Sequence, residues 1–173
     1  MPRLGLGSSL TGGSVADSAL SNSYSLSFDG SNQYIDIGSP SSLGLGTNDF
    51  SFSAWIQTTK AGYSWVFSMN STNGLGIGTH NSGGLARLWI GGQVFVTDGI
   101  DIKDGDWHHY CVTREGTTLL VYIDNVVDDT ATSTGSIAAG AAKIGTWSTG
   151  TDYWDGLIDE VAIWDVALDS DAV

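Results

Sequence analysis

The segment DGDWHHYCVTREGTTLLVYIDN, residues 104–125, gathers side chains that can bind metals or act as acids, bases and nucleophiles. It contains two adjacent histidines, three aspartates, an arginine and the only cysteine of the 173-residue chain. Neighbouring side chains of a strand point to opposite faces, so His108 and His109 do not readily bind one ion, and His80 is remote in the sequence. A zinc site needs three or four such ligands together, so the segment does not predict one.

A structural role explains the same residues. Polar and apolar residues alternate along DWHHYCVTRE and TTLLVYIDN, which predicts two paired strands joined at Glu115-Gly116, with an imidazole hydrogen-bonded in the core. Cys111 fits a small buried hydrophobic residue, and a nucleophile paired with His109 is the alternative. The segment therefore favours a hairpin over an active site.

Catalytic signatures are missing from the rest of the sequence. No serine lies in a Gly-x-Ser-x-Gly elbow. Glycoside hydrolysis needs two carboxyl groups about 5–10 Å apart, and the only glutamates are Glu115 and Glu160. The sequence predicts a protein that is not an enzyme.

Short apolar runs separated by Gly, Asn and Asp predict strands throughout the chain. Tyr24, Leu26 and Phe28 alternate with serine, and Trp55 is expected on the opposite face of its strand from Ile56. No segment has a sustained helical period. We expect an all-β fold, a two-sheet antiparallel β-sandwich of about a dozen strands. The predicted strands lie within residues 23–30, 32–38, 50–58, 63–69, 74–79, 86–92, 93–99, 106–115, 117–125, 141–147 and 154–168.

The chain divides into two parts. Residues 1–23 are rich in Gly and Ser and predict a flexible or docking N-terminal arm, whereas residues 24–173 form one domain. The N-terminus lacks the apolar run of a signal peptide, so we expect folding in the cytoplasm, with later action on a virion or other extracellular surface.

Charge limits the partners. Six basic and 19 acidic residues give a net charge of −13, which disfavours nucleic acid and anionic membrane. No run approaches the ~20 apolar residues needed for membrane insertion. Carboxylates do suit hard cations such as Ca²⁺.

The order of four motifs carries a family resemblance. SLSFDGSNQYIDIG, FSFSAWIQ, the segment 104–125 and KIGT…YWDGLIDEVAIWDVAL together resemble the laminin G-like, or concanavalin A-like, jelly roll superfamily over about residues 24–173. The resemblance implies the jelly roll fold but no single activity, because lectins, adhesion modules, pentraxins and glycosidases share it. The Glu-x-Asp-x-(x)-Glu string of its β-glucanase members is absent here.

The resemblance also implies a structural calcium ion. Many members hold Ca²⁺ between the first strand and the last long one, and the matching positions are Asp29, the backbone of Gly30, and Asp159. Oxygen ligands of this kind suit Ca²⁺. The alternative is that Asp29 caps a turn and Asp159 faces solvent or Arg114.

Ligand binding in such folds uses a concave sheet or the loops at one rim, where aromatic rings stack on sugars. The candidate ligand-binding residues are Trp147, Tyr153 and Trp154, in a polar loop. Trp65, Trp89 and Asn70 are alternatives, and each ring could instead fill the sandwich.

Two functions follow from these expectations. The first is a non-catalytic adhesion module on a particle or cell surface that recognises a glycan or cell-surface ligand, with Ca²⁺ as an assisting ion. The alternative is a virion decoration, fibre or other structural protein that self-assembles or attaches to a capsid or tail scaffold through residues 1–23. A glycoside hydrolase is the third alternative.

Overall fold

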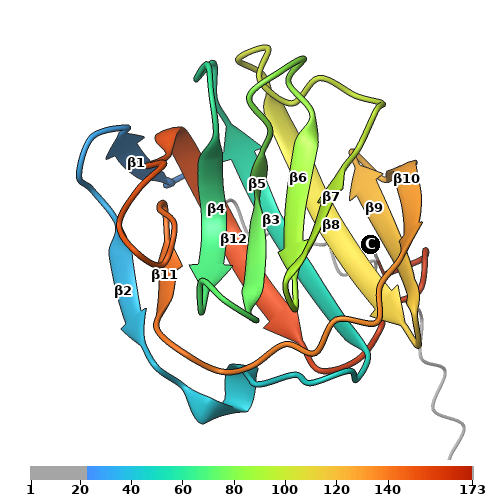
Figure 1. Ribbon diagram of the computed structural model, residues 1–173. Coiled ribbons are helices and arrows are strands. Elements are labelled where there is room, and N and C mark those ends of the chain that lie inside the picture. Colours follow the sequence, from blue (N-terminus) through green and yellow to red (C-terminus); the bar gives the residue numbers. More distant parts are fainter. Residues whose placement is uncertain (1–22, 173) are drawn as a thin grey trace, which may run out of the picture.

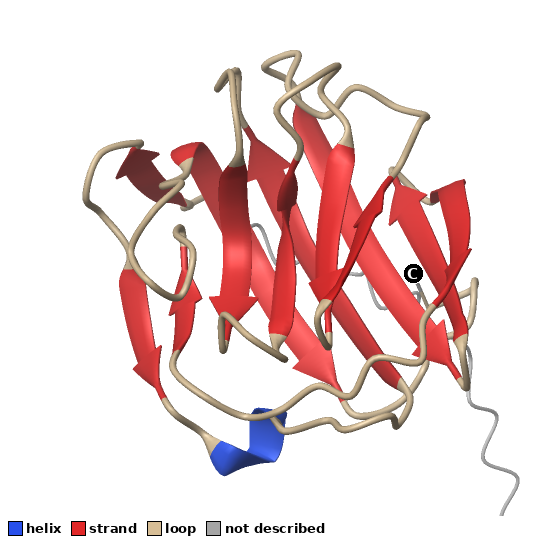
Figure 2. Cartoon of the chain, in the orientation of Figure 1, coloured by secondary structure: helices blue, strands red, loops and turns tan. Residues whose placement is uncertain are grey.

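The computed structural model describes residues 23–172, which form two antiparallel β-sheets packed face to face (Figure 1, Figure 2). The predicted arm, apart from Ser23, lies outside these residues. The all-β sandwich prediction is confirmed. The strands are β1 (Leu26–Asp29), β2 (Ile35–Gly38), β3 (Phe50–Gln57), β4 (Ser64–Met69), β5 (Leu75–Thr79), β6 (Ala86–Ile90), β7 (Gln93–Val96), β8 (Trp107–Glu115), β9 (Thr118–Ile123), β10 (Val126–Thr132), β11 (Ala142–Ile144) and β12 (Asp155–Trp164), with a 3₁₀ turn η1 (Ser41–Leu43).

Each sheet has six strands. The first sheet has the order β1-β12-β3-β8-β9-β10, and the second has the order β2-β11-β4-β5-β6-β7. In Figure 1 the second sheet, with β4 to β7, lies in front of the first. Within the described part of the chain, no helix is long and apolar enough to cross a membrane.

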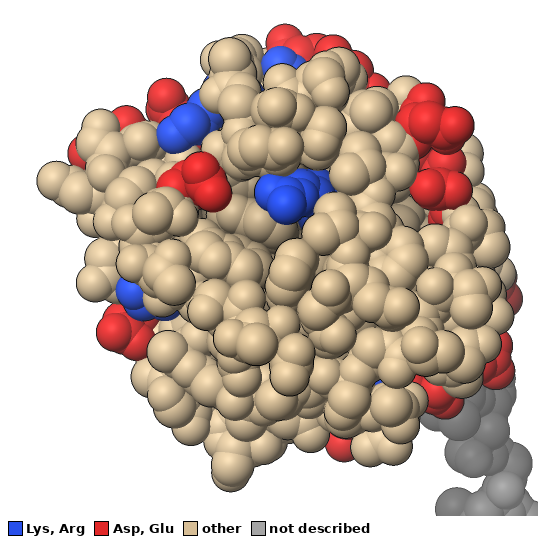
Figure 3. Space-filling model, in the orientation of Figure 1, with Lys and Arg blue, Asp and Glu red and all other residues tan. Residues whose placement is uncertain are grey.

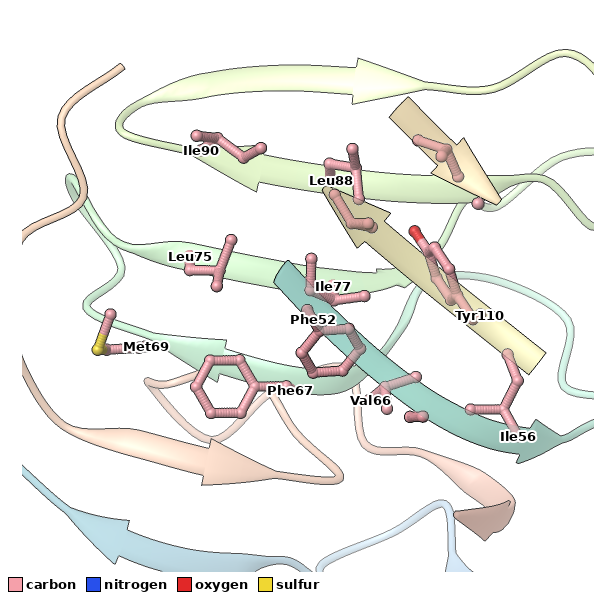
Figure 4. Close-up of a cluster of buried hydrophobic side chains, with 14 of the residues drawn as sticks. Phe52, Ile56, Val66, Phe67, Met69, Leu75, Ile77, Leu88, Ile90 and Tyr110 are labelled. Atoms are coloured by element: carbon pink, nitrogen blue, oxygen red, sulfur yellow. The ribbon is translucent and has the colours of Figure 1, made fainter. Parts of the chain in front are cut away.

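The core lies between the two sheets (Figure 4). Phe52 and Ile56 of β3 and Tyr110 of β8 face Phe67 and Ile77 of the second sheet, and all five are at most 1 % exposed. This follows from the period-two alternation of the strands, in which every second side chain points inward.

Both histidines and the cysteine of residues 104–125 lie in the hairpin of β8 and β9. His108 is buried, and its ring bridges two carboxylates: Nδ1 lies 2.7 Å from Asp124 Oδ2 and Nε2 lies 3.0 Å from Asp104 Oδ1. Cys111 is fully buried, and burial raises the pKa of its thiol to about 11, which leaves almost no thiolate near neutral pH. The two strands pair as the alternation predicted.

One strand was not predicted. β10 carries the sequence VVDDTAT, whose alternation is weak, and a register shift lies between Val127 and Asp129. The Asp128 carboxylate at this bulge accepts a hydrogen bond from the backbone N–H of Ile100, at 2.6 Å. A polar residue with such a role interrupts the alternating pattern by which a strand is recognised in the sequence.

Candidate functional site

Glycines form the outward face in the middle of the second sheet. Leu75 and Ile77 of β5 point into the core, so Gly76 and Gly78 between them lie on the outer face. On one side of β5, Trp65 pairs with Gly78, and on the other side Trp89 pairs with Gly76. On the outer face of β5 there are therefore no side chains at Gly76 and Gly78, and these two residues are here called the glycine floor. Large side chains of the neighbouring strands flank this floor.

A bulge in β4 turns Trp65 outward. The register shifts between Trp65 and Phe67, and both Val66 and Phe67 belong to the core cluster. Because the bulge gives the core two consecutive residues of β4, Trp65 is left over the glycine floor of β5.

Three tryptophan rings meet above this floor. The centroid of the Trp147 ring lies 4.4 Å from that of Trp65, with 35° between their planes, and 6.0 Å from that of Trp89, edge-on at 84°. A β-carbon on Gly76 would stand 2.6 Å from Cζ3 of Trp147 and 2.8 Å from Cζ3 of Trp65. Only glycine at position 76 admits this arrangement of rings.

Arg87 completes the cluster from β6. Its guanidinium carbon lies 4.9 Å from the centroid of the Trp65 ring and 4.4 Å from that of Tyr63. Such cation–π contacts hold the planar group in place while leaving its edge donors free to bind. Among residues 23–172, no carboxylate lies within ion-pair distance of Arg87.

These side chains line a pocket of about 270 Å³, here called the tryptophan pocket. Figure 3 views the face of the second sheet, where most residues are uncharged and a basic group lies in a hollow with an acidic group close by. The pocket is lined by Trp65, Ser71, Arg87, Trp89, Trp147 and Asp152.

Two indole donors in the pocket wall lack a partner. The Nε1 atoms of Trp65 and Trp89 are buried and make no hydrogen bond to any described residue. A buried, unpaired donor of this kind costs about 1–3 kcal/mol, and native proteins contain few of them.

The predicted ligand-binding residues have three different positions. Trp147 lies in the tryptophan pocket. Tyr153 is half-buried, and its ring packs near Tyr34 with 6.4 Å between the centroids. Trp154 is fully buried, and its indole N–H donates to the carbonyl of Leu157 at 3.3 Å. Trp154 is therefore a core residue, and a ligand cannot stack on it.

The alternative candidates are partly brought together. Trp65 and Trp89 join Trp147, whereas Asn70 uses its side-chain amide to bond the carbonyl of Ala139 at 3.1 Å. Arg87 was not predicted. Its signal in the sequence was the strand ARLWIGG, which places Arg87 and Trp89 on the same face, two residues apart.

The predicted calcium ligands do not form one site. Asp29 pairs with Asp155, so Asp159 lies about 13 Å further along β12. The Asp29 carboxylate instead accepts the backbone N–H groups of Ser31, at 2.9 Å, and of Asn32. The N–H of Ser31 is the main cause that lowers the pKa of Asp29, so this residue caps its turn.

A lysine binds the Gly30 carbonyl, one of the groups that the resemblance assigns to the ion. The Lys60 ammonium donates to the carbonyl of Gly30 at 3.1 Å and to that of Tyr153 at 2.6 Å. Two converging carbonyls suit a hard cation, but here a side-chain cation fills the space between them. Within residues 23–172, no three His, Cys, Asp or Glu side chains are grouped to hold a metal. The residues present do not fit the implied calcium ion.

A second concave region lies on the outer face of the first sheet. It is a groove of about 510 Å³ lined by Trp55, Trp107 and Asp159, with Tyr24 at one end. Ser23, the first described residue, is also part of its lining. The tryptophan pocket is the better defined site.

A two-sheet jelly roll with an aromatic pocket on one sheet face is a lectin-like sandwich. Residues 29–173 match the family model of the concanavalin A-like lectin/glucanases superfamily, and the chain belongs to this superfamily. No curated protein sequence matches the chain.

Solved structures share the fold at low identity. Domain 4 of AbnA, an extracellular arabinanase from Geobacillus stearothermophilus solved with arabinotriose, is 21 % identical with a TM-score of 0.67, over 86 % of this chain and 73 % of that one. The CBM40 of a Ruminococcus gnavus IT-sialidase is 9 % identical with a TM-score of 0.67, over 85 % and 92 %. The binding domain of Paraclostridial Mosquitocidal Protein 1 is 16 % identical with a TM-score of 0.66, over 85 % and 44 %. The chain thus spans less than half the length of this last structure, and likeness at these identities establishes the fold.

Proposed function

We propose that this chain is a non-catalytic glycan-binding module and that the tryptophan pocket is its binding site. The observation that carries the proposal is the meeting of three indole rings over a glycine floor, with Arg87 and Asp152 lining the same pocket. The apolar face of a sugar ring stacks on an aromatic ring, and a few polar groups around it fix the sugar hydroxyls.

The two half-buried rings have different roles in this proposal. Trp147 comes from the loop between β11 and β12, and its backbone is held by hydrogen bonds of 2.9 Å to the carbonyl of Thr151 and 2.8 Å from the N–H of Gly150. It is the platform that a sugar stacks on. Trp89 stands edge-on to it and forms a side wall, and the exposed Asp152 accepts hydrogen bonds from sugar hydroxyls.

The kinds of ligand found on related folds support the proposal. One neighbour was solved with arabinotriose, and another is the CBM40 of a sialidase. Display on a particle or cell surface, attachment through residues 1–23 and assistance by calcium stay predictions.

The test is a glycan array probed with the purified chain, once with Ca²⁺ and once with EDTA. We expect selective binding that Trp147→Ala weakens by about 2 kcal/mol, roughly 30-fold, as for tryptophan at the centre of a binding site. Trp164→Ala is the matched control, because Trp164 is also partly exposed, at 36 %, but lies outside the pocket at the end of β12.

Two results would contradict the proposal. One is an array without selective binding. The other is an equal loss of binding in the two tryptophan variants, which would place the site elsewhere or show that the effect is not local.

A further inference from the structure

Arg87 is the one group of the tryptophan pocket that neutral sugars do not explain. A guanidinium has five N–H donors and no acceptor, and it is charged at any physiological pH. Its flat face is used by the rings of Tyr63 and Trp65, at 4.4 and 4.9 Å. Among the described residues, none accepts a hydrogen bond from its guanidinium nitrogens, although the side chain is half-buried.

The other buried arginine of the sandwich shows the contrast. Arg114 is 1 % exposed, and its nitrogen atoms donate to the backbone carbonyls of Gly46, Asn48 and Gly135. Each of its three side-chain nitrogen atoms donates, which holds these loops together. Arg87 has no such structural task, so its donors are available to a ligand.

We propose that the tryptophan pocket selects a sugar that carries a carboxylate, with Arg87 as the residue that binds the carboxylate. This inference rests on the proposed glycan-binding function. A guanidinium and a carboxylate form two parallel charge-assisted hydrogen bonds, which set both the affinity and the orientation of the acid. With Trp147 stacking on the ring, the sugar would be fixed at two points.

Charge elsewhere in the molecule limits the ligand further. The chain carries a net charge of −13, and Asp152 lines the same pocket as Arg87. A polyanion such as a sulfated chain would meet repulsion over the whole surface, whereas one carboxylate meets the guanidinium at close range. The ligand class is therefore a glycan with an isolated acidic residue, and Asp152 is left to accept hydrogen bonds from its hydroxyls.

The experiment uses pairs of sugars that differ only in the acid. Calorimetry or competition on the array would compare glucuronic acid with glucose and galacturonic acid with galactose, and each acid with its uncharged methyl ester. In the wild-type chain we expect the matching acid to bind about tenfold more tightly than its neutral partners, as for a bidentate ion pair. Arg87→Gln should reduce this ratio to about one.

Three variants make the result specific. Arg87→Lys keeps the positive charge but loses the two parallel N–H donors of the guanidinium, so the preference for the acid should fall without disappearing. Lys143→Met removes one positive charge from the same sheet, where its ammonium lies 4.6 Å from the ring centroid of Tyr34 and outside the pocket, and it should leave the ratio unchanged. Circular dichroism and the melting temperature would verify that each variant is folded.

The outcomes separate this inference from the function it rests on. If sugars bind but acids and esters bind equally, or if Arg87→Gln weakens both alike, the acid selectivity is wrong and glycan binding stands. If no sugar binds on the array or in solution, both proposals are wrong. An acid preference that Lys143→Met also removes would show that net charge, rather than Arg87, is responsible.

Discussion

Substitution of Lys60 by methionine should lower the stability of the sandwich, and calcium should not affect the stability of the natural chain. Lys60 ties together two segments that are far apart in the sequence, through hydrogen bonds of 3.1 Å to the Gly30 carbonyl and 2.6 Å to the Tyr153 carbonyl. These segments follow β1 and precede β12, the two strands that pair at the edge of the first sheet. The lysine thus performs at this junction the task that an ion would perform.

The expected magnitude follows from the two bonds. A hydrogen bond from a charged group contributes about 1.5–3 kcal/mol, but Lys60 is only half-buried and water can reach part of the junction. Two such bonds give at least about 3 kcal/mol before solvent screening is considered. Screening lowers this figure and methionine keeps the apolar stem of the side chain, so we expect a loss of about 2 kcal/mol in total. For a domain of this size, that loss corresponds to a fall of about 4–8 °C in the melting temperature.

The assay is thermal unfolding followed by circular dichroism, with calcium and with EDTA. Lys143→Met is the control for the change in net charge, because the Lys143 ammonium contacts only the face of the Tyr34 ring and should contribute less than about 1 kcal/mol. A lower melting temperature of the natural chain in EDTA would refute this prediction, because it would show that a bound calcium ion stabilises the fold. Equal melting temperatures for the two lysine variants would show that the junction does not depend on Lys60.

Two other predictions concern the hairpin and the pocket floor. Burial alone would lower the pKa of His108, but its hydrogen bonds to Asp124 and Asp104 outweigh burial and raise it. The imidazolium therefore stabilises the fold fully below about pH 6.5, and this contribution is lost as the pH rises through the raised folded-state pKa. The difference in melting temperature between the natural chain and His108→Gln should shrink as the pH rises above about 6.5, and a constant difference would contradict this prediction. Gly76→Ala should weaken glycan binding at least about tenfold, because its methyl group would stand within 3 Å of the Trp147 and Trp65 rings, and unchanged binding would show that these rings do not form the site.

The sequence predicted the sheets well because the signal for a strand is local. Alternation along FSFSAWIQ placed Phe52 and Ile56 in the core and Trp55 outside, and burial confirms each position. The turn at Glu115-Gly116 joins β8 to β9 as expected. β10 was missed because its polar residues, Asp128 among them, make contacts that only the folded chain reveals.

The register of the strands explains why the predicted calcium ligands lie apart. A motif gives the order of residues along the chain, but the distance between residues on paired strands depends on which residues lie opposite each other. Asp29 lies opposite Asp155, so Asp159 is four residues too far along β12 to share a ligand with it. The cation between the carbonyls, Lys60, comes from a third segment that carries no recognisable signal.

The residues of the tryptophan pocket could also be predicted only in part from the sequence. Trp147 was chosen because its loop is polar, yet the same argument chose Trp154, which is fully buried. What separates these residues is the floor beneath them: the glycines of β5 make room for Trp147, and the bulge of β4 brings Trp65 to the same place. A pocket assembled from three strands and a loop can be recognised in the sequence only by its floor, where glycine alternates with core residues along GLGIGT. Glycine weakens the interior of a strand unless something large must approach closely. Its repeated use in the middle of the second sheet is therefore the feature of this sequence that points most directly to a site on that face.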